Sequence, residues 1–157
     1  MSPAPFIAQI CGPAQQCMGA THIPASFIIA QAALESAWGE SRLTVVANNL
    51  FGIKADPAWT GERFQIVTKE YVDGNPVLVG AWFRKYPDWQ ASIDDHARFI
   101  QDARYAQAFH TGNGIEFGYA VAAAGYATDP QYGQKLESVI TTHQLLTYDW
   151  TAGNPST

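Results

Sequence analysis

Glu35 is a carboxylate in a part of the chain that is otherwise apolar. Residues 25–38 would be apolar on nearly every side of a helix, as in a helix that runs through a core, and only Ser26, Gln31, Glu35 and Ser36 interrupt this pattern. Keeping a carboxylate charged in such surroundings costs on the order of several kcal/mol. Glu35 is therefore expected to be paired with a cation, exposed at a cleft, or protonated with a raised pKa.

Two further side chains share the predicted helix face of Glu35. Gln31 precedes it by four residues and Trp38 follows it by three, so the three should form a polar notch bordered by an aromatic ring. Such a notch is typical of a cleft wall. Glycoside hydrolysis needs an acid that keeps its proton near neutral pH, and an apolar, aromatic pocket raises the pKa of a Glu towards that range. The alternative is an ion pair between Glu35 and Arg42 or Arg98.

Composition limits the other classes of function. The chain has 157 residues, of which 47% are hydrophobic and 15% charged, which is enough for one compact core. We expect a single catalytic domain over residues 1–150 and a flexible tail over residues 151–157. The formal charge of -5 argues against nucleic-acid binding, which needs a basic face.

The termini, cysteines and histidines add few constraints. The first residues lack the basic start and apolar run of a secretory signal, and no apolar stretch approaches the roughly 20 residues of a membrane span. Cys11 and Cys17 are interpreted as two small, partly buried residues, or as a disulfide that would indicate an oxidising compartment. The histidines show no metal-ligand spacing, so neither a metal nor a cofactor is expected; they are His22, His96, His110 and His143.

Helical patterns come before and after one β-hairpin. Residues 4–18 predict a helix interrupted near Gly12-Pro13, and Pro24 opens the helix that carries Glu35. Residues 64–72 and 77–84 are β-rich and flank the turn sequence DGNP. Later helices are predicted from Asp88, around residues 105–109, over residues 115–124, and after Asp129 as a cap with Pro130 in the first turn. This order predicts an α+β protein with a β-lobe at about residues 60–86.

Three sequence blocks together resemble one family of cell-wall enzymes. They are AQAALESAWGES (residues 30–41), NNLFGIKA (residues 48–55) and YATDPQYGQKL (residues 126–136). In this order they resemble the bacterial glucosaminidases of glycoside hydrolase family 73, which include the muramidase domain of the flagellar rod-assembly protein and Gram-positive autolysins. The resemblance extends from Phe6 to Leu146. It implies a lysozyme-like fold in which a mainly helical lobe and a small β-hairpin lobe flank a substrate cleft.

The resemblance also implies roles for the carboxylates. Glu35 matches the catalytic acid of the family directly. A second catalytic carboxylate in the β-lobe corresponds to Glu70, with Glu62 as the reserve candidate, whereas Asp73 is better explained as the first residue of a turn. The alternative for Glu70 is an exposed strand carboxylate with no catalytic part.

Other residues of these blocks are candidates for substrate binding. Asn48 and Asn49 can offer amide groups to an N-acetyl group or a sugar hydroxyl, or can stabilise their own turn. A family tyrosine that orients the substrate aligns with Tyr126 or Tyr132, and we prefer Tyr126. Phe51 is expected in the core. At least one tryptophan near the β-lobe is expected to stack on sugar, although each could instead belong to the core; they are Trp59, Trp82 and Trp89.

The resemblance predicts cleavage of peptidoglycan after N-acetylglucosamine. A muramidase, a lytic transglycosylase and a non-catalytic glycan-binding module are the alternatives. If Glu70 lies across the cleft it could activate water and the anomer would invert; otherwise the N-acetyl oxygen of the substrate could attack, with retention. Without a signal peptide, delivery is expected by phage lysis, flagellar export or a secretion system. We favour an injected antibacterial toxin with an immunity protein that occupies the cleft.

Overall fold

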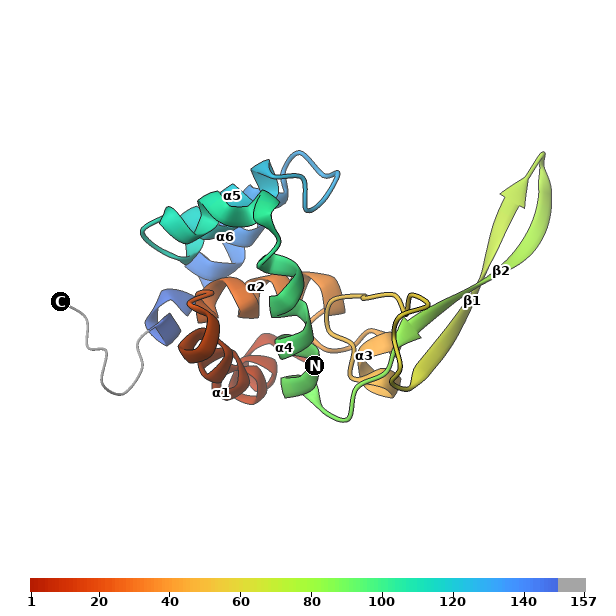
Figure 1. Cartoon of the computed structure of the whole chain (residues 1–157), viewed down its shortest axis with the longest axis horizontal. Coiled ribbons are helices and arrows are strands. Elements are labelled where there is room, and N and C mark those ends of the chain that lie inside the picture. Colours follow the sequence, from red (N-terminus) through yellow and green to blue (C-terminus); the bar gives the residue numbers. More distant parts are fainter. Residues whose placement is uncertain (150–157) are drawn as a thin grey trace.

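The computed structural model describes residues 1–149, so the predicted tail, residues 151–157, lies outside the described part. Helices form most of the body, and one antiparallel hairpin extends from it (Figure 1). The helices are α1 (Pro3–Thr21), α2 (Ala25–Ser36), α3 (Arg42–Ala47), α4 (Trp89–Ile100), α5 (Gly114–Ala123) and α6 (Tyr132–Thr142), with 3-10 helices η1 (Ala103–His110) and η2 (Leu145–Asp149) and strands β1 (Arg63–Val72) and β2 (Asn75–Arg84). This order confirms the predicted α+β class.

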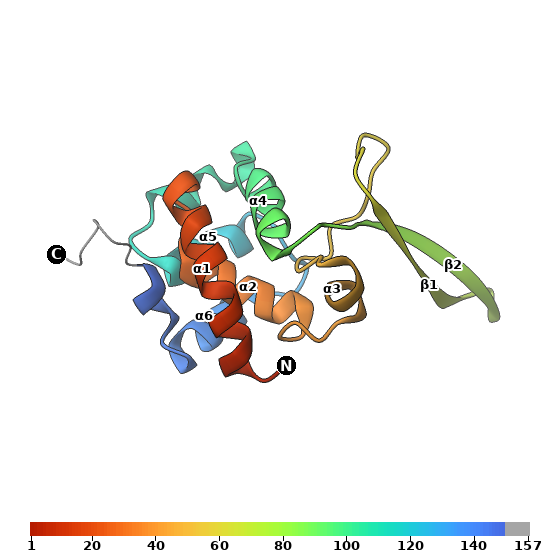
Figure 2. The same ribbon diagram turned by 90° about the horizontal axis from the view of Figure 1, so that it is seen from below.

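Helix α2 is the centre of the core. Every residue from Ala25 to Ala33 is buried, and α1, α5, α6 and η2 all pack against the helix (Figure 2). Burying each large apolar side chain of α2, such as Phe27 or Ile29, contributes about 1.5–3 kcal/mol. The predicted central helix is therefore confirmed, and it gives Glu35 a rigid support.

Helix α1 is continuous, so the predicted interruption near Gly12-Pro13 is wrong. Pro13 removes one backbone hydrogen bond of the helix. The buried side chains on both sides of it still form one apolar stripe, and this packing outweighs the local loss; they are Phe6, Ile10, Ala14 and Cys17. Cys11 and Cys17 are both free thiols, so the alternative of a disulfide between them is not observed.

Helix α2 ends at Ser36, two residues earlier than predicted. Ala37, Trp38 and Gly39 adopt the left-handed conformation, with φ of 51°, 56° and 82°. The Ser36 hydroxyl accepts the N–H of Gly39 at 2.9 Å and closes this turn. Trp38 therefore leaves the helix face that it was predicted to share with Glu35.

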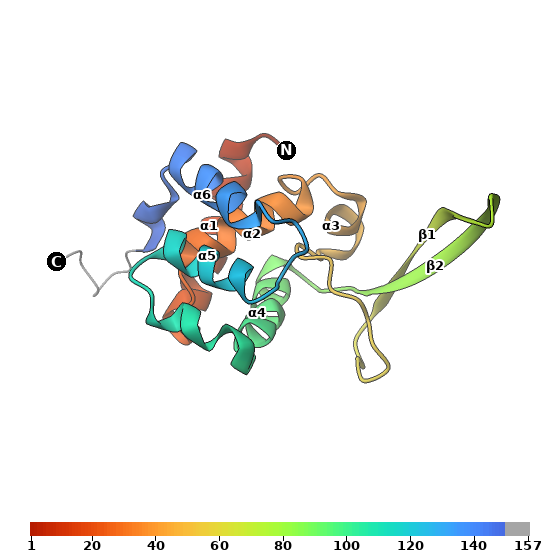
Figure 3. The same ribbon diagram turned by 90° about the horizontal axis from the view of Figure 1, so that it is seen from above.

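The hairpin is a long exposed arm. Its strands pair in register from Arg63 with Arg84 to Val72 with Asn75. Asp73 and Gly74, with φ of 51° and 80°, form the two-residue turn, which is tighter than the predicted four-residue one. In all three views the turn points away from the helices (Figure 3). Many apolar side chains of the arm are exposed, among them Val67, Tyr71, Val72, Val77, Leu78 and Val79.

A buried ionic network joins the base of the arm to α4. The Arg84 guanidinium donates to Asp95 at 2.9 Å, and the Tyr86 hydroxyl donates to the same carboxylate at 2.5 Å. Arg98 also pairs with Asp95. Burial alone would raise the pKa of Asp95, but the hydrogen bonds from these three side chains outweigh it and hold the pKa below its ordinary value. The base is therefore fixed even though the arm is exposed.

The later helices begin close to their predicted positions. Asp88 caps α4 by accepting the N–H of Ala91 at 2.8 Å, as predicted. Helix α6 begins at Tyr132, later than expected, because Asp129 accepts the N–H of Gln131 at 2.9 Å and closes a separate turn before the helix. Among residues 1–149, no helix has both the length and the apolar character needed to cross a membrane.

Candidate active site

Glu35 lies in the last turn of α2, with its side chain partly open to solvent and one carboxyl oxygen held by the protein. The Tyr132 hydroxyl, from α6, donates to Oε1 of Glu35 at 3.0 Å. Neither predicted arginine pairs with Glu35: the Arg42 guanidinium lies over the ring of Phe64, and Arg98 pairs with Asp95. The ion-pair alternative for Glu35 is therefore not observed in the described residues.

The surroundings of Glu35 favour its protonated form. Removal of water by the neighbouring protein raises the pKa of Glu35, and the hydrogen bond from Tyr132 offsets part of this rise. The carboxyl also lies at the C-terminal end of a helix, where the helix dipole disfavours a negative charge. Glu35 thus combines a raised pKa with a side chain that solvent, and therefore a substrate, can reach, and no cation pairs with it in the described residues.

Gln31 lies behind Tyr132, one helical turn below Glu35. Its side chain is fully buried, with an exposed fraction of 0%, and its amide nitrogen donates to the Tyr132 oxygen at 3.1 Å. The predicted helix face of Gln31 and Glu35 is present. The structure, however, places Gln31 out of reach of a substrate, and it contacts the acid through Tyr132.

Both candidate tyrosines belong to one aromatic stack. Tyr126 and Tyr132 are stacked with ring centroids 5.8 Å apart and planes at 17°. The Tyr126 hydroxyl lies 3.3 Å from Nε2 of His96, and burial, followed by the negative charge of Glu35, raises the pKa of both phenols. Tyr126 is preferred from the sequence, but Tyr132 is the one that hydrogen-bonds to the acid.

His96 is a residue of this site that sequence reasoning missed. Its ring is buried and stacked on Phe51 at 3.8 Å, and burial lowers its pKa to about 3, which keeps it neutral. The helical spacing of Ile93, His96 and Ile100 is the signal that could have placed it on the buried face of α4. Phe51 is buried, as predicted.

A pocket of about 370 Å³ lies between the aromatic stack and the base of the arm. Tyr126 and His96 line it from the helical side, and Ile53, Lys54 and Arg84 line it from the base of the arm. Tyr126 is the link between this pocket and Glu35, because it stacks on the tyrosine that holds the acid. Glu35 and Tyr132 are not among the residues that line the pocket, so the acid itself lies outside it.

The side chains of the two candidate asparagines form hydrogen bonds with backbone groups. Asn49 is buried, and its amide accepts the N–H of Ile53 at 3.1 Å and donates to the carbonyl of Arg84 at 2.8 Å. Asn48 ends α3 in the left-handed conformation and donates to the carbonyl of Tyr86 at 3.1 Å. Asn49 therefore stabilises its own turn, and both side chains tie that turn to residues 84–86, while substrate binding by either asparagine stays a prediction.

The tryptophans divide between the core and the arm. Trp38 packs edge-on against Phe6, with centroids 5.6 Å apart, and Trp89 is buried against the same ring. Trp59 donates to the carbonyl of Glu62 and packs on the Arg84 guanidinium. Trp82, on β2, has an exposed fraction of 48%, so it is the most open of the four to a sugar.

Within residues 1–149, neither candidate for a second catalytic carboxylate, Glu70 or Glu62, lies on the helices that hold Glu35. Glu70 pairs with Val77 in the outer half of the arm, where its carboxylate accepts a hydrogen bond from Thr68. At 3.3 Å per residue, Glu70 is about 23 Å along the strand from Arg63 at the base. Glu62 is exposed beside that base, with its carboxylate 3.9 Å from the Lys85 ammonium.

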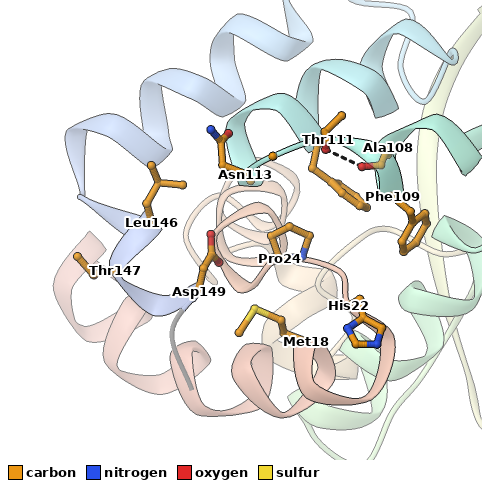
Figure 4. A pocket seen from close by; sticks show the side chains of 13 residues that line it. Met18, His22, Pro24, Ala108, Phe109, Thr111, Asn113, Leu146, Thr147 and Asp149 are labelled. Atoms are coloured by element: carbon orange, nitrogen blue, oxygen red, sulfur yellow. Dashed lines mark hydrogen bonds between the residues drawn. The ribbon is translucent and has the colours of Figure 1, made fainter. Parts of the chain in front are cut away.

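A separate pocket of about 480 Å³ lies at the opposite end of α2 (Figure 4). Met18, Pro24 and Phe109 line it, and the carboxylate of Asp149 points into the same region (Figure 4). That carboxylate already accepts hydrogen bonds from the N–H and hydroxyl of Ser26, at 2.8 and 2.7 Å. Because α2 is about 18 Å long, this pocket is distinct from the site of Glu35. Within residues 1–149, no group of three His, Cys, Asp or Glu side chains could hold a metal ion.

The comparisons with known proteins indicate the same family. A model described as Mannosyl-glycoprotein endo-beta-N-acetylglucosaminidase matches residues 11–145. The Peptidoglycan hydrolase FlgJ of Vibrio cholerae is 42% identical over 119 residues, which cover 73% of this chain and 36% of the relative. The Exo-glucosaminidase LytG of Bacillus subtilis is 38% identical over 150 residues, which cover 92% of this chain and 52% of the relative. The chain thus spans about a third to a half of these relatives.

Solved structures agree with this result. The glycoside hydrolase domain of Salmonella typhimurium FlgJ superposes with a TM-score of 0.82 at 33% identity, covering 91% of this chain and 98% of that one. A type VI secretion system effector-immunity complex from Pseudomonas protegens shares the fold, with a TM-score of 0.60 at 18% identity, over 91% of this chain and 92% of the other. The predicted lysozyme-like architecture is therefore confirmed.

Proposed function

The chain belongs to the glucosaminidase family, and on that premise we propose that it hydrolyses the glycan backbone of peptidoglycan as an endo-β-N-acetylglucosaminidase. The observation that carries the proposal is the Glu35 carboxyl, which has a raised pKa at a solvent-exposed position, is free of a cationic partner in residues 1–149, and is held by Tyr132 in the last turn of α2. A muramidase or a lytic transglycosylase would need the same acid, so the bond that is cut must come from product analysis.

In the proposed reaction, Glu35 protonates the glycosidic oxygen as positive charge develops at the anomeric carbon. Tyr132 then donates to the new carboxylate and stabilises it. Tyr126 and His96 hold the Tyr132 ring in place through stacking and a hydrogen bond. Glu35, Tyr132 and His96 extend from helices α2, α6 and α4, and Tyr126 from the segment between α5 and α6, so the acid is positioned before substrate binds.

For the attacking group we propose the N-acetyl oxygen of the substrate. An inverting pair of carboxyls needs a separation of about 6.5–9.5 Å, and Glu70 lies in the outer half of an arm that points away from the helices. Substrate-assisted attack needs no second carboxylate and predicts retention of the anomer. The mechanism in which Glu70 activates water predicts inversion.

The test uses purified peptidoglycan with the wild type and Glu35→Gln. After digestion, the new reducing ends are reduced with borohydride and identified by mass spectrometry. Reduced N-acetylglucosamine ends from the wild type alone would support the proposal, whereas reduced muramic ends would indicate a muramidase. If neither folded protein produced new ends, a glycan-binding module would replace the enzyme.

For the biological setting we propose an injected antibacterial effector whose cleft is occupied by an immunity protein. The support is the fold that the chain shares with the Pseudomonas protegens effector. Directing the wild type to the periplasm of a Gram-negative host should stop growth, and Glu35→Gln should not. Growth unaffected by a demonstrably active enzyme in that compartment would contradict this setting.

A further inference from the structure

Gln31 carries an unusual combination of contacts for a core residue. It is fully buried in α2, its amide nitrogen donates to Tyr132, and its amide oxygen is the one buried side-chain N or O atom without a hydrogen-bond partner in residues 1–149. An unpaired buried acceptor destabilises a fold. An apolar residue of the same shape would avoid that cost, so packing alone does not explain a glutamine here.

Hydrogen-bond directions suggest what the glutamine does. The Tyr132 hydroxyl has one proton, and the amide nitrogen of Gln31 has no free lone pair to accept it. The proton must therefore point to Oε1 of Glu35, 3.0 Å away. If the amide were reversed, its oxygen would compete for this proton, and a buried N–H would be left unpaired, which is the rarer defect in proteins.

We propose that Gln31 is a positioning residue, which acts through Tyr132 to keep Oε1 of Glu35 hydrogen-bonded and so to leave the acid proton on Oε2. Oε1 receives a hydrogen bond both before and after proton transfer, so it is never the oxygen that carries the proton. The acid then delivers its proton from one defined atom. This inference rests on the proposed function of Glu35, and it assigns to Gln31 a role that does not require contact with substrate.

The chain of hydrogen bonds from Gln31 through Tyr132 to Glu35 is called the relay below. Titration of Glu35 is a direct readout of it, because of the groups that surround the carboxyl. Tyr132 faces the carboxyl from α6, and Tyr126 lies behind Tyr132. His96 contacts Tyr126 from α4 and stays neutral, because burial lowers its pKa to about 3. No Lys, Arg or His pairs with Glu35 in the described residues. Loss of the relay should therefore change the pKa of Glu35 without a competing charge effect.

The first experiment follows the Glu35 carboxyl by carbon NMR titration, with Glu35→Gln used to assign the signal. Tyr132→Phe removes the hydrogen bond, so it should raise the pKa of Glu35. Gln31→Met should raise it less, since the donor to Tyr132 only strengthens that bond, by roughly 10–30% in a hydrogen-bonded chain. An unchanged titration of Glu35 in Gln31→Met would overturn the inference.

A matched control separates the relay from a general loss of stability. Ser92→Ala removes another fully buried polar side chain, whose hydroxyl accepts the N–H of Leu50, and it should leave the titration unchanged. If Ser92→Ala shifted the pKa of Glu35 as much as Gln31→Met does, the proposed relay would be overturned.

Activity gives the second readout. Gln31→Met should lower kcat by no more than about fourfold, as expected if it weakens one hydrogen bond by roughly 10–30%, leave KM unchanged, and move the basic limb of the pH profile to higher pH. A fall in activity that is equal at every pH would contradict the inference, because it would indicate only a structural role. If the titration shifts as expected but the wild type cuts no peptidoglycan, the proposed function fails and the hydrogen-bond relay stands.

Discussion

The helical body and the hairpin arm carry their candidate carboxylates in opposite ways. Glu35 is held by Tyr132, behind which lie Gln31, Tyr126 and His96. Glu70 lies on a two-stranded ribbon whose side chains are almost all exposed. Partial desolvation raises the pKa of Glu35, and the hydrogen bond from α6 fixes one of its carboxyl oxygens, whereas the carboxylate of Glu70 accepts a hydrogen bond from Thr68 of its own strand. We expect these different environments, and not membership of a family motif alone, to decide which carboxylate takes part in the reaction.

The largest expected effect tests the two carboxylates against each other. Glu35→Gln should lower kcat by about 10²–10⁴-fold, because it removes the acid. Glu70→Gln should lower it less than about tenfold, since the reaction proposed here uses no second carboxylate. Release of reducing ends measures both, and proton NMR of the first product gives the anomer. Equal losses together with inversion would return Glu70 to the mechanism.

The second prediction concerns the joint between the two regions. Arg84→Leu should destabilise the fold by about 3–5 kcal/mol, because it breaks a buried ion pair and leaves Asp95 with fewer donors. Urea unfolding measures this loss. Arg63→Leu is the matched control, since Arg63 is exposed on the paired position of β1 and should change stability far less.

The third prediction removes the outer arm. Replacing residues 68–79 with Asn-Gly joins Val67 to Gly80, which already face each other in the register. Thermal unfolding should change little, because the removed residues are exposed. Activity on polymeric peptidoglycan should fall about tenfold or more, mainly through KM, if the arm positions glycan. Unchanged KM would mean that the helical body alone binds the substrate.

The smallest expected effect concerns His96 and pH. The folded pKa of His96, about 3, lies below its ordinary value of 6.5, so the stability that it contributes is present above pH 6.5 and is lost as pH falls. Between pH 6.5 and 5 this loss is about 2 kcal/mol. His96→Phe should flatten the pH dependence of Tm in that window. A slope equal to that of the wild type would show that His96 is not held neutral.

Much of the architecture could be predicted from sequence, because it follows local rules. The apolar run of α2, the Asp88 cap and the β-rich segments around Asp73-Gly74 each determine their own element. The failures come from tertiary packing. Helix α1 passes through Pro13 because buried residues lie on both sides of it, and Trp38 leaves the acid's face because three left-handed residues turn the chain.

Tertiary contacts also limit what the sequence can predict about the candidate site. Glu35 could be identified from its apolar surroundings and its sequence block, and both tyrosines were candidates. No pattern along the chain could show that Tyr132 is the direct partner, since the contact joins residues 97 positions apart. The roles of Asn48 and Asn49 also depended on carbonyl groups of the distant Tyr86 and Arg84.

The exposed arm also has a consequence for local unfolding. A two-stranded ribbon that packs on no third layer is marginally stable by itself, whereas opening α2 requires loss of the core. Backbone amides of the outer arm should therefore exchange with deuterium through local fluctuations, and those of α2 only through global unfolding. The protein would then behave as two cooperative units of very different stability, with the acid anchored in the slow one.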